Sequence, residues 1–554
     1  MLALAAILAV LFLSQGIHAP FEKDEESRPA GIVRDVVQHN NWLVPRDDYG
    51  EATRKPPLFY WLTAIATEIT GGQVDEAHAR ALSLLAAVVI SVEVMSFSAS
   101  YLGESAGWLA MMFLLGIYGF SSRAGHARTD MLFSALLFSA WYALYAQIEE
   151  RPTRVRTILI GTLLGLAILT KGPLALALCG GGIVIYLVLQ RRNPIDVMRT
   201  GWPWQAAGLA LAIAALWYLP AFLHDRSLIS VQFGEENFGH LMPSRWGGTG
   251  EAARPVYYIL ARMLGAALPL SLYIPALALA LWNGELWGET RKPIVYQLSI
   301  VLAVLAMFSI ASAKRDIYIL PALPSLAILF AGLFAVAPRM AFSARILWIV
   351  AGVIIAAAAV ALIIGGIAIG FGAAIPARFT RGMQSSDAAY AALVAKGIAQ
   401  WQWRFVIFDI AAAFAAAAIA ISMVLRRPRW AAIGVALMSM AGVSLWIGTL
   451  RPELMGGRTL KEFAAQTREI VNQRPVYLLG GIDYELSFYL DRGVPVWTPK
   501  AETVAGRVYI VGSSDEVDRL TPERRAGMKT LLSSQCPLRR RQMLLFEAVK
   551  SPRR

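Results

Sequence analysis

Four closely spaced carboxylates are the first residues of this sequence that could carry chemistry. Glu22, Asp24, Glu25 and Glu26 lie in the stretch FEKDEESRPAG, soon after an almost wholly apolar run that ends at Ile17. A carboxylate in this position is either a solvated group at a membrane edge or a base that takes a proton from a reacting hydroxyl. Residue type alone does not separate these two interpretations.

A candidate cation follows in the segment RKPPLFYW. Lys55 precedes two prolines and an aromatic cluster that includes Tyr60. Each proline disfavours helix for the residue before it, and Pro57 suits the first turn of a helix. We therefore expect Lys55 at the mouth of an interfacial helix, where its ammonium group can pair with a phosphate oxygen. Snorkelling of the lysine to lipid headgroups is the alternative.

The composition predicts that helices in a membrane position these residues. The chain of 554 residues is 57% hydrophobic and 16% charged, whereas soluble domains have roughly 25% charged residues. We predict an all-α polytopic membrane protein with about thirteen transmembrane helices. The first run is interpreted as a helix and not as a signal peptide, because no small-residue cleavage site precedes the acidic stretch. The predicted spans are 1–18, 78–102, 107–121, 130–148, 157–171, 173–190, 205–223, 257–281, 294–312, 316–337, 345–371, 403–425 and 430–449.

Short basic loops predict the orientation of these spans. Such loops face the cytoplasm, and here they include EERPTRVR, RRNPIDVMR and LRRPR. The net charge of +13 is concentrated in them, which argues against nucleic-acid binding. The acidic stretch, the loops 224–256 and 372–402 and the tail from residue 450 then lie outside.

Two domains are expected. Residues 1–449 form the membrane domain, and its first outer loop, 19–77, contains two amphipathic segments, Ala30–His39 and Pro57–Ile69, that would lie in the interface. Residues 450–554 form a small α/β domain, with a helix over Leu460–Asn472 and strands in PVYLLGG and RVYIVG. With only two cysteines, no disulfide framework is expected.

Several motifs in the outer segments resemble those of a known family. An acidic pair, R-x-A, W-x-V-P and K-P-P-L-x-Y-W occur within one outer loop, and R-T-D-M follows at Arg128–Met131. This series resembles the GT-C class of membrane glycosyltransferases, in particular the bacterial transferases that place 4-amino-4-deoxy-L-arabinose on lipid A, and the related protein O-mannosyltransferases. The resemblance extends over most of the chain.

The resemblance leaves two alignments open in the acidic stretch. The family has D-E-x-R-Y-A about fifteen residues before W-x-V-P, and counting back from Trp42 sets Glu25 and Glu26 against D-E, with proline in place of the usual tyrosine. Alignment by residue type selects Asp24 instead. The spacing favours Glu25 as the catalytic carboxylate, with Asp24 as the alternative. Arg54 stands where relatives often have Glu, which puts an acidic role there in doubt.

The resemblance also implies roles for individual residues. A polyprenyl-phosphate donor would be held by cations at its phosphate, and Glu25 would act as the base in a single, inverting displacement. Asp130 would contact the substrate, where the alternative is an N-cap. The implied donor-phosphate residues are Lys55, Arg28, His240, Arg245, Arg254 and Tyr318, and the implied pocket residues are Glu26, Tyr60 and Arg128.

The same resemblance implies the cofactors, partners and location. No cofactor is certain, and a divalent cation could be held by Glu25, Glu236 and His240. The implied partners are an undecaprenyl-phosphate-linked sugar and lipid A, on the periplasmic side of a bacterial inner membrane. Alternatives are a protein O-mannosyltransferase, another polyprenyl-phosphate hexosyltransferase, or a lipid flippase. A flippase is disfavoured because the charges cluster at one face rather than at mid-membrane.

Overall fold

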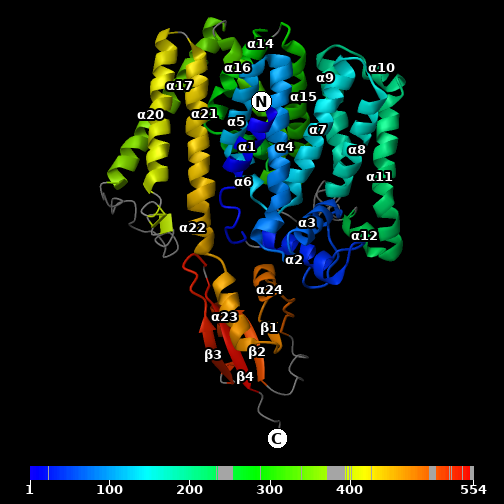
Figure 1. Ribbon diagram of the computed structural model, residues 1–554, viewed down its shortest axis with the longest axis vertical. Coiled ribbons are helices and arrows are strands. Elements are labelled where there is room, and N and C mark those ends of the chain that lie inside the picture. Colours follow the sequence, from blue (N-terminus) through cyan, green and yellow to red (C-terminus); the bar gives the residue numbers. More distant parts are fainter. Residues whose placement is uncertain are drawn as a thin grey trace.

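The molecule consists of a helical bundle with a small α/β domain at one end, which we call the domain end (Figure 1). The computed structural model describes residues 1–22, 24–232, 234, 254–286, 288–337, 340–370, 393–394, 396–397, 400, 402–425, 427–497, 507–522, 525, 527–539 and 541–549. Its bundle helices are α1 (Leu2–Leu13), α4 (Glu76–Leu102), α5 (Glu104–Gly116), α6 (Tyr118–Ala124), α7 (Thr129–Glu149), α8 (Arg154–Lys171), α9 (Leu174–Leu189), α10 (Pro194–Arg199), α11 (Trp202–His224), α12 (Ser227–Ile229), α13 (Tyr258–Ala266), η3 (Leu270–Tyr273), α14 (Ile274–Trp282), α15 (Arg291–Ile310), η4 (Asp316–Ala322), α16 (Leu323–Val336), α17 (Phe342–Gly370), α20 (Gln402–Leu425), α21 (Pro428–Leu445), η6 (Trp446–Leu450) and α22 (Arg451–Gly456).

The bundle has the length and apolarity of a multi-pass membrane domain. Within the described ranges, eight helices are long and apolar enough to cross a membrane, or up to ten if each of two bent pairs is one span. The predicted span 107–121 is broken, because α5 and α6 meet at 72°, and so is 257–281, which bends by 113° after α13. The thirteen spans therefore stay a prediction, since α1 and α9 are short helices of 12 and 16 residues.

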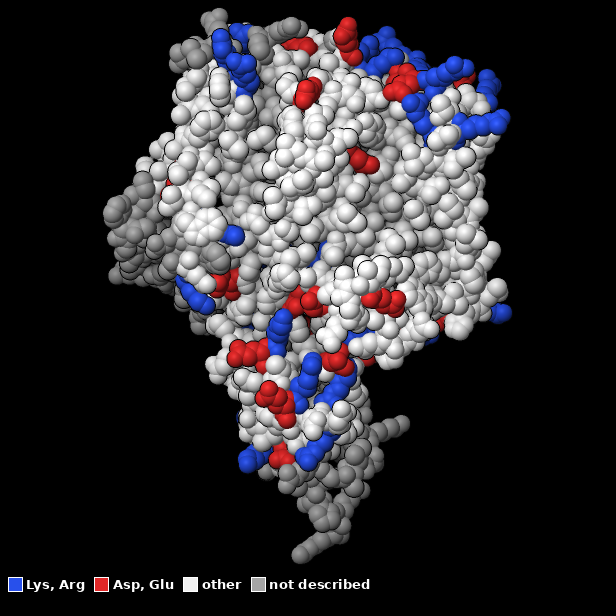
Figure 2. Space-filling model, viewed as in Figure 1, with Lys and Arg blue, Asp and Glu red and all other residues white. Residues whose placement is uncertain are grey.

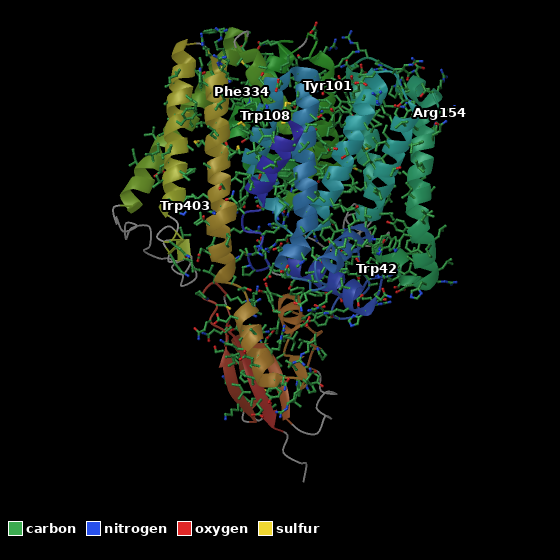
Figure 3. All side chains as sticks on the ribbon, in the orientation of Figure 1. Trp42, Tyr101, Trp108, Arg154, Phe334 and Trp403 are labelled. Atoms are coloured by element: carbon green, nitrogen blue, oxygen red, sulfur yellow. The ribbon has the colours of Figure 1, made fainter. Side chains whose placement is uncertain are left out.

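The charge distribution separates the two ends of the bundle. Figure 2 shows Lys and Arg gathered at the end opposite the domain, charges of both signs near the domain end, and a nearly uncharged surface between them. Such an apolar band is expected where lipid covers the protein. Arg154, in a loop predicted to be cytoplasmic, and Trp42, in the first outer loop, lie at opposite ends, as predicted (Figure 3).

Two further helices of the first outer loop, α2 (Asp24–His39) and α3 (Leu58–Ile69), pack together at the domain end (Figure 1). The predicted interfacial segments are thus helical. However, α2 begins six residues before Ala30 and contains Pro29, so the acidic stretch forms its first turn. Acidic residues favour a helix N-terminus because they complement the helix dipole.

The C-terminal domain consists of α23 (Lys461–Val471), β1 (Val476–Leu478), α24 (Tyr484–Leu490), β2 (Arg507–Ser513), α25 (Ser514–Asp518), β3 (Met528–Ser533) and β4 (Met543–Val549). The helix and both strands predicted in the tail are present. The sheet order is β1-β2-β4-β3, with β1 and β2 parallel and the other pairs antiparallel.

Arg34 of α2 fixes this domain to the bundle. Its side chain is 7% exposed and pairs with Asp48 at 2.7 Å and Asp491 at 2.9 Å. It also donates to the carbonyl oxygen of Phe488, in the last turn of α24. A cation at a helix C-terminus is favoured by the helix dipole. The domain is therefore attached to the same helix that begins with the acidic stretch.

Candidate active site

A cavity of about 500 Å³ lies where α2, α3, α7, α8, α9, α15 and η4 meet. Many of the residues that the sequence singled out line it. The lining comprises Asp24, Glu25, Arg28, Pro29, Ile32, Arg54, Lys55, Pro56, Tyr60, Arg128, Thr129, Asp130, Lys171, Pro173, Leu174, Ala177, Gln232, Met307, Phe308, Ala311, Ala313, Arg315, Ile317 and Tyr318. Three carboxylates face six cationic side chains there, so the described lining carries a formal excess of positive charge.

Asp130 lies in the first turn of α7 and is buried. One carboxylate oxygen pairs with Lys171 Nζ at 2.6 Å, and the other pairs with Arg128 Nε at 3.1 Å. The predicted N-cap role does not apply, because Arg128 occupies the N-cap position of α7. Asp130 instead holds two cations against the cavity wall.

Glu25 lies at the rim of the cavity and is more accessible than Asp130. Its side chain is 62% exposed and its Oε2 atom contacts Arg128 Nη1. Arg128 therefore bridges Glu25 and Asp130, which come from α2 and α7. Asp24 lines the same cavity, so the structure brings both candidates for the catalytic base to one site.

Lys55 reaches the cavity from the turn that precedes α3. The Thr53 hydroxyl donates to the Lys55 carbonyl oxygen at 2.9 Å, and α3 begins three residues later at Leu58. Its ammonium group lies near enough to Asp130 and Lys171 to act on both electrostatically. Lys55 thus lies just before the start of α3, as the two prolines predicted, and it lines the cavity.

Arg28 lines the cavity but is also engaged by the first outer loop. It pairs with Asp47 at 2.9 Å and Glu51 at 3.3 Å, and its guanidinium lies 5.1 Å from the ring centre of Tyr484. Its charge is therefore partly compensated within the protein, and its role as a helper at the donor phosphate stays a prediction.

Aromatic and aliphatic groups form an apolar part of the cavity wall. Tyr318 stacks on Phe308, with ring centres 4.5 Å apart, and Lys171 Nζ lies 5.4 Å from the Tyr318 ring centre. Leu174 and Met307, near the ends of α9 and α15, continue this wall. The cavity therefore combines a cationic side with an apolar side, as an amphiphilic ligand requires.

Arg254 lies in a neighbouring cavity of about 390 Å³. Glu25, Arg128, Arg315 and Ile317 line both cavities, so the two are adjacent. The other described lining residues of the second cavity are Arg254, Lys314 and Asp316.

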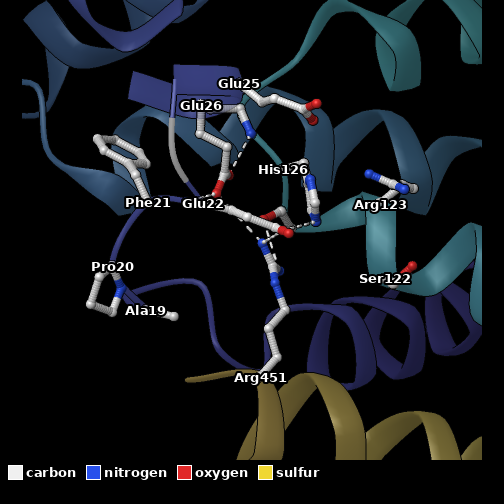
Figure 4. Close-up of polar contacts among 12 residues, drawn as sticks. Ala19, Pro20, Phe21, Glu22, Glu25, Glu26, Ser122, Arg123, His126 and Arg451 are labelled. Atoms are coloured by element: carbon white, nitrogen blue, oxygen red, sulfur yellow. Dashed lines mark hydrogen bonds and ion pairs between the residues drawn. The ribbon is translucent and has the colours of Figure 1, made fainter. Parts of the chain in front are cut away.

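Glu26 was expected in the pocket, but it is not among the residues that line the cavity, and its carboxylate points in a different direction from that of its neighbour Glu25 (Figure 4). Glu26 is fully buried and forms a bidentate pair with Arg80, both contacts at 2.8 Å. Burial alone would raise the pKa of Glu26, but Arg80 outweighs it and holds the pKa well below its usual range. Successive helical residues are about 100° apart, so the two carboxylates lie on different faces of α2.

Three of the expected site residues, Glu236, His240 and Arg245, lie outside the described residues. The metal site suggested for Glu25, Glu236 and His240 is therefore not tested by the structure. In the ranges that are described, no group of three or more His, Cys, Asp or Glu side chains is placed to hold a metal ion.

Lys171 and Arg315 also line the cavity. Of the two, only Arg315, in the stretch AKRDIYILP, is expected from the sequence to touch the lipid phosphate or close the pocket. Both are outer basic residues at helix ends, in TKGP and AKRD. Cations at the outer ends of spans, against the orientation rule, were the available signal. The sequence could not show that Lys171 pairs with Asp130, because these residues come from different helices.

Comparisons with known proteins show what the chain is similar to. The family model for dolichyl-phosphate-mannose-protein mannosyltransferase matches residues 54–218. The undecaprenyl phosphate-alpha-4-amino-4-deoxy-L-arabinose arabinosyl transferase of Pseudomonas savastanoi pv. phaseolicola is 26% identical over 339 residues, 60% of each chain. Its namesake in Aeromonas salmonicida is 29% identical over 344 residues, 59% of each. The chain thus matches about three fifths of the length of these curated relatives.

A solved structure is similar over nearly the whole chain. It is the crystal structure of ArnT from Cupriavidus metallidurans bound to undecaprenyl phosphate, with a TM-score of 0.76 and 19% sequence identity. The match covers 98% of this chain and 97% of that chain. At this identity the match establishes the fold, including the bundle and the C-terminal domain together. In its motifs, its sequence relatives and its fold, this chain resembles the lipid-phosphate-dependent membrane glycosyltransferases of the GT-C class.

Proposed function

We propose that this protein is an inverting glycosyltransferase that moves 4-amino-4-deoxy-L-arabinose from undecaprenyl phosphate to lipid A. The observation that carries the proposal is the cavity in which Lys55, Lys171 and Arg128 surround the carboxylates Glu25 and Asp130, beside an apolar wall. The names of the sequence relatives, and the carrier lipid in the similar crystal structure, support the donor.

The cavity offers what transfer from a lipid-phosphate sugar requires. The leaving group is a phosphate monoester, and fixed cations stabilise the charge that develops as the glycosidic bond breaks. Lys55 and Lys171 reach the cavity from different elements and can hold the phosphate between them. The apolar wall near Leu174 and Met307 can accommodate the first units of a polyprenyl chain.

Glu25 is placed to act on the acceptor. A hydroxyl acceptor needs a base on the side of the anomeric carbon opposite the departing phosphate. Glu25 is exposed at the rim and lines both cavities, so an acceptor in the second cavity would meet it. A single displacement of this kind inverts the anomeric centre. Asp130, with both oxygens paired, would act by positioning Lys171 and Arg128.

The location follows from the same arrangement. The basic loop at Arg154 and the first outer loop lie at opposite ends of the bundle, which supports a periplasmic cavity and C-terminal domain by the positive-inside rule. The protein would then be an inner-membrane enzyme. Addition of an amino sugar would lower the negative charge of the outer surface, which would bind cationic peptides such as polymyxin less well.

A second candidate function is transfer of a hexose to protein or to another acceptor. The match of residues 54–218 to the mannosyltransferase family model favours it. The residues that contact a phosphate would be the same in both cases, so the choice lies in the sugar and the acceptor.

One assay distinguishes these functions. Purified protein in lipid nanodiscs is given a lipid A precursor with either undecaprenyl-phosphate aminoarabinose or a polyprenyl-phosphate hexose, and the products are identified by mass spectrometry. We expect the mass of lipid A to increase by one aminopentose. Transfer only from the hexosyl donor would refute the proposed donor, and no transfer from either would refute the proposed function.

Site variants test the residue assignments in the same assay. We expect Glu25→Gln to abolish measurable transfer and Asp24→Asn, its matched neighbour, to retain most of it. The opposite result would make Asp24 the base. Full activity in Glu25→Gln and in Lys55→Ala would refute the assignment of both residues.

A further inference from the structure

Glu26 lies at the centre of a buried polar cluster beside the cavity (Figure 4). Arg80 of α4 donates from Nε to one Glu26 oxygen and from Nη2 to the other, both at 2.8 Å. Arg451, the first residue of α22, approaches the same carboxylate at 3.5 Å. Both arginines are buried, so the carboxylate compensates charges that come from two separate helices.

The same carboxylate also fixes two backbone segments. The Ala127 N–H donates to Glu26 Oε1 at 3.0 Å, and the Glu22 N–H donates to Oε2 at 2.8 Å. Ala127 directly precedes Arg128. Glu26 therefore joins the first turn of α2 to the segment that leads into α7.

This connection places the groups that line the cavity. Glu25 is the neighbour of Glu26 on α2, and Arg128 is the neighbour of Ala127. Arg128 in turn contacts Glu25 and pairs with Asp130 at 3.1 Å. The N-terminal turn of α2 and the start of α7 are thus connected twice, through Glu26 with Ala127 and through Glu25 with Arg128. These two connections fix the position of Glu25 with respect to Asp130.

We propose that Glu26 is a positioning residue for the proposed glycosyl transfer: its buried carboxylate holds α2 against the segment before α7, so that Glu25 and Arg128 meet at the cavity rim. This inference rests on the proposed function. A displacement of about 1 Å at a reacting group can cost on the order of 100-fold in rate. The Glu26 contacts described above join α2 to α4, to α22 and to the segment before α7, whereas Lys55 and Lys171 come from the turn before α3 and from α8, so donor binding should change little.

Glu26→Gln tests the proposal. The amide keeps the size of the side chain, but its NH₂ group faces the Arg80 guanidinium, donor against donor. We expect kcat to fall on the order of 100-fold while KM for the donor changes by less than about threefold. We expect Glu26→Asp, which keeps the charge, to have a kcat between those of Glu26→Gln and wild type.

Glu76→Gln is the matched control. Glu76 is also a buried glutamate, and it joins α4 to the C-terminal domain by accepting from Lys461 Nζ at 2.7 Å and from the Tyr489 hydroxyl at 2.9 Å. Because these contacts do not involve the segment before α7, the kcat of Glu76→Gln should remain within about threefold of wild type.

Hydrogen exchange gives a second readout that does not depend on activity. The Ala127 amide should exchange at least about tenfold faster in Glu26→Gln, because its acceptor is weakened, and should be unchanged in Glu76→Gln. A kcat near wild type in Glu26→Gln, an equal loss in Glu76→Gln, or unchanged exchange at Ala127 would overturn the proposal. Absence of transfer by the wild type would instead overturn the proposed function and leave the exchange result to decide the role of Glu26.

Discussion

The pair formed by Asp130 and Lys171 allows a quantitative prediction. Their charged atoms are 2.6 Å apart, and both side chains are about one-tenth exposed. Coulomb attraction at this distance is about 6 kcal/mol for an effective dielectric constant near 20. Most of this gross value offsets the desolvation of the two ions. The pair is therefore worth little more than a neutral pair of the same size, although each partner depends strongly on the other.

Removal of one partner should thus be costly, and removal of both should be tolerated. We expect Asp130→Asn to lower the free energy of unfolding by about 3–5 kcal/mol, since it leaves the buried Lys171 without its partner. Lys171→Met should also lower it, but by less, since Asp130 keeps its pair with Arg128. The double variant should lose less than either single variant, about 2 kcal/mol or less in total, because no buried charge is then left without its partner. Asp130→Asn should be the more harmful single change, because Asp130 also pairs with Arg128.

Unfolding in mixed micelles with a rising fraction of sodium dodecyl sulfate, followed by tryptophan fluorescence, measures these differences. Asp196→Asn is the control, because Asp196 faces Arg199 at 3.7 Å and both side chains are about two-thirds or more exposed. It should change the stability by less than about 1 kcal/mol. Wild-type stability of Asp130→Asn, or additive losses in the double variant, would refute the reasoning.

Three further predictions concern the donor, acid stability and the domain contact. Lys55→Ala should lower kcat/KM for the lipid-phosphate donor about 100-fold, and Arg226→Ala, an exposed arginine near the same end of the bundle, should not; kinetics with both variants would decide. Burial and the nearby Arg451 lower the pKa of the His126 imidazole well below 6.5. As the pH drops below about 6.5, the imidazole therefore binds a proton in the unfolded chain before it does so in the folded protein, and the stability should fall. His126→Gln should flatten that part of the melting-temperature profile, and an unchanged profile would contradict it. Arg34→Ala should leave a buried carboxylate unpaired, lower stability by about 3–5 kcal/mol and speed proteolysis near residue 457, and unaltered cleavage would argue against the attachment.

Local patterns predicted much of the architecture. Apolar runs located most of the bundle helices, and alternation with glycine boundaries located β1 and β2. The prolines beside Lys55 correctly predicted the turn before α3. Periodicity could not show the bends after Gly116 and Ala266, because each half of a broken span is as apolar as an unbroken one.

The candidate site was predictable only in part, because its residues come from several helices. The spacing from Trp42 aligned Glu25 and Glu26 with the acidic pair of the family and favoured Glu25. The face of α2 on which each of them lies follows from where the helix begins, at Asp24, and from how it packs. The pairing of Asp130 with Lys171 joins α7 to α8 and depends on helix packing. Contacts of this kind have no local signature in a single sequence.

The ion pair between Glu26 and Arg451 also bears on the order of assembly. These residues are 425 positions apart, so a nascent chain displays Glu26 and Arg80 long before Arg451 has been synthesised. Every helix from α5 to α21 must be made in between. The cluster that supports the rim of the cavity is therefore completed only when translation has reached α22, the last bundle helix, so the site cannot be fully assembled before the whole membrane domain up to α21 has been made.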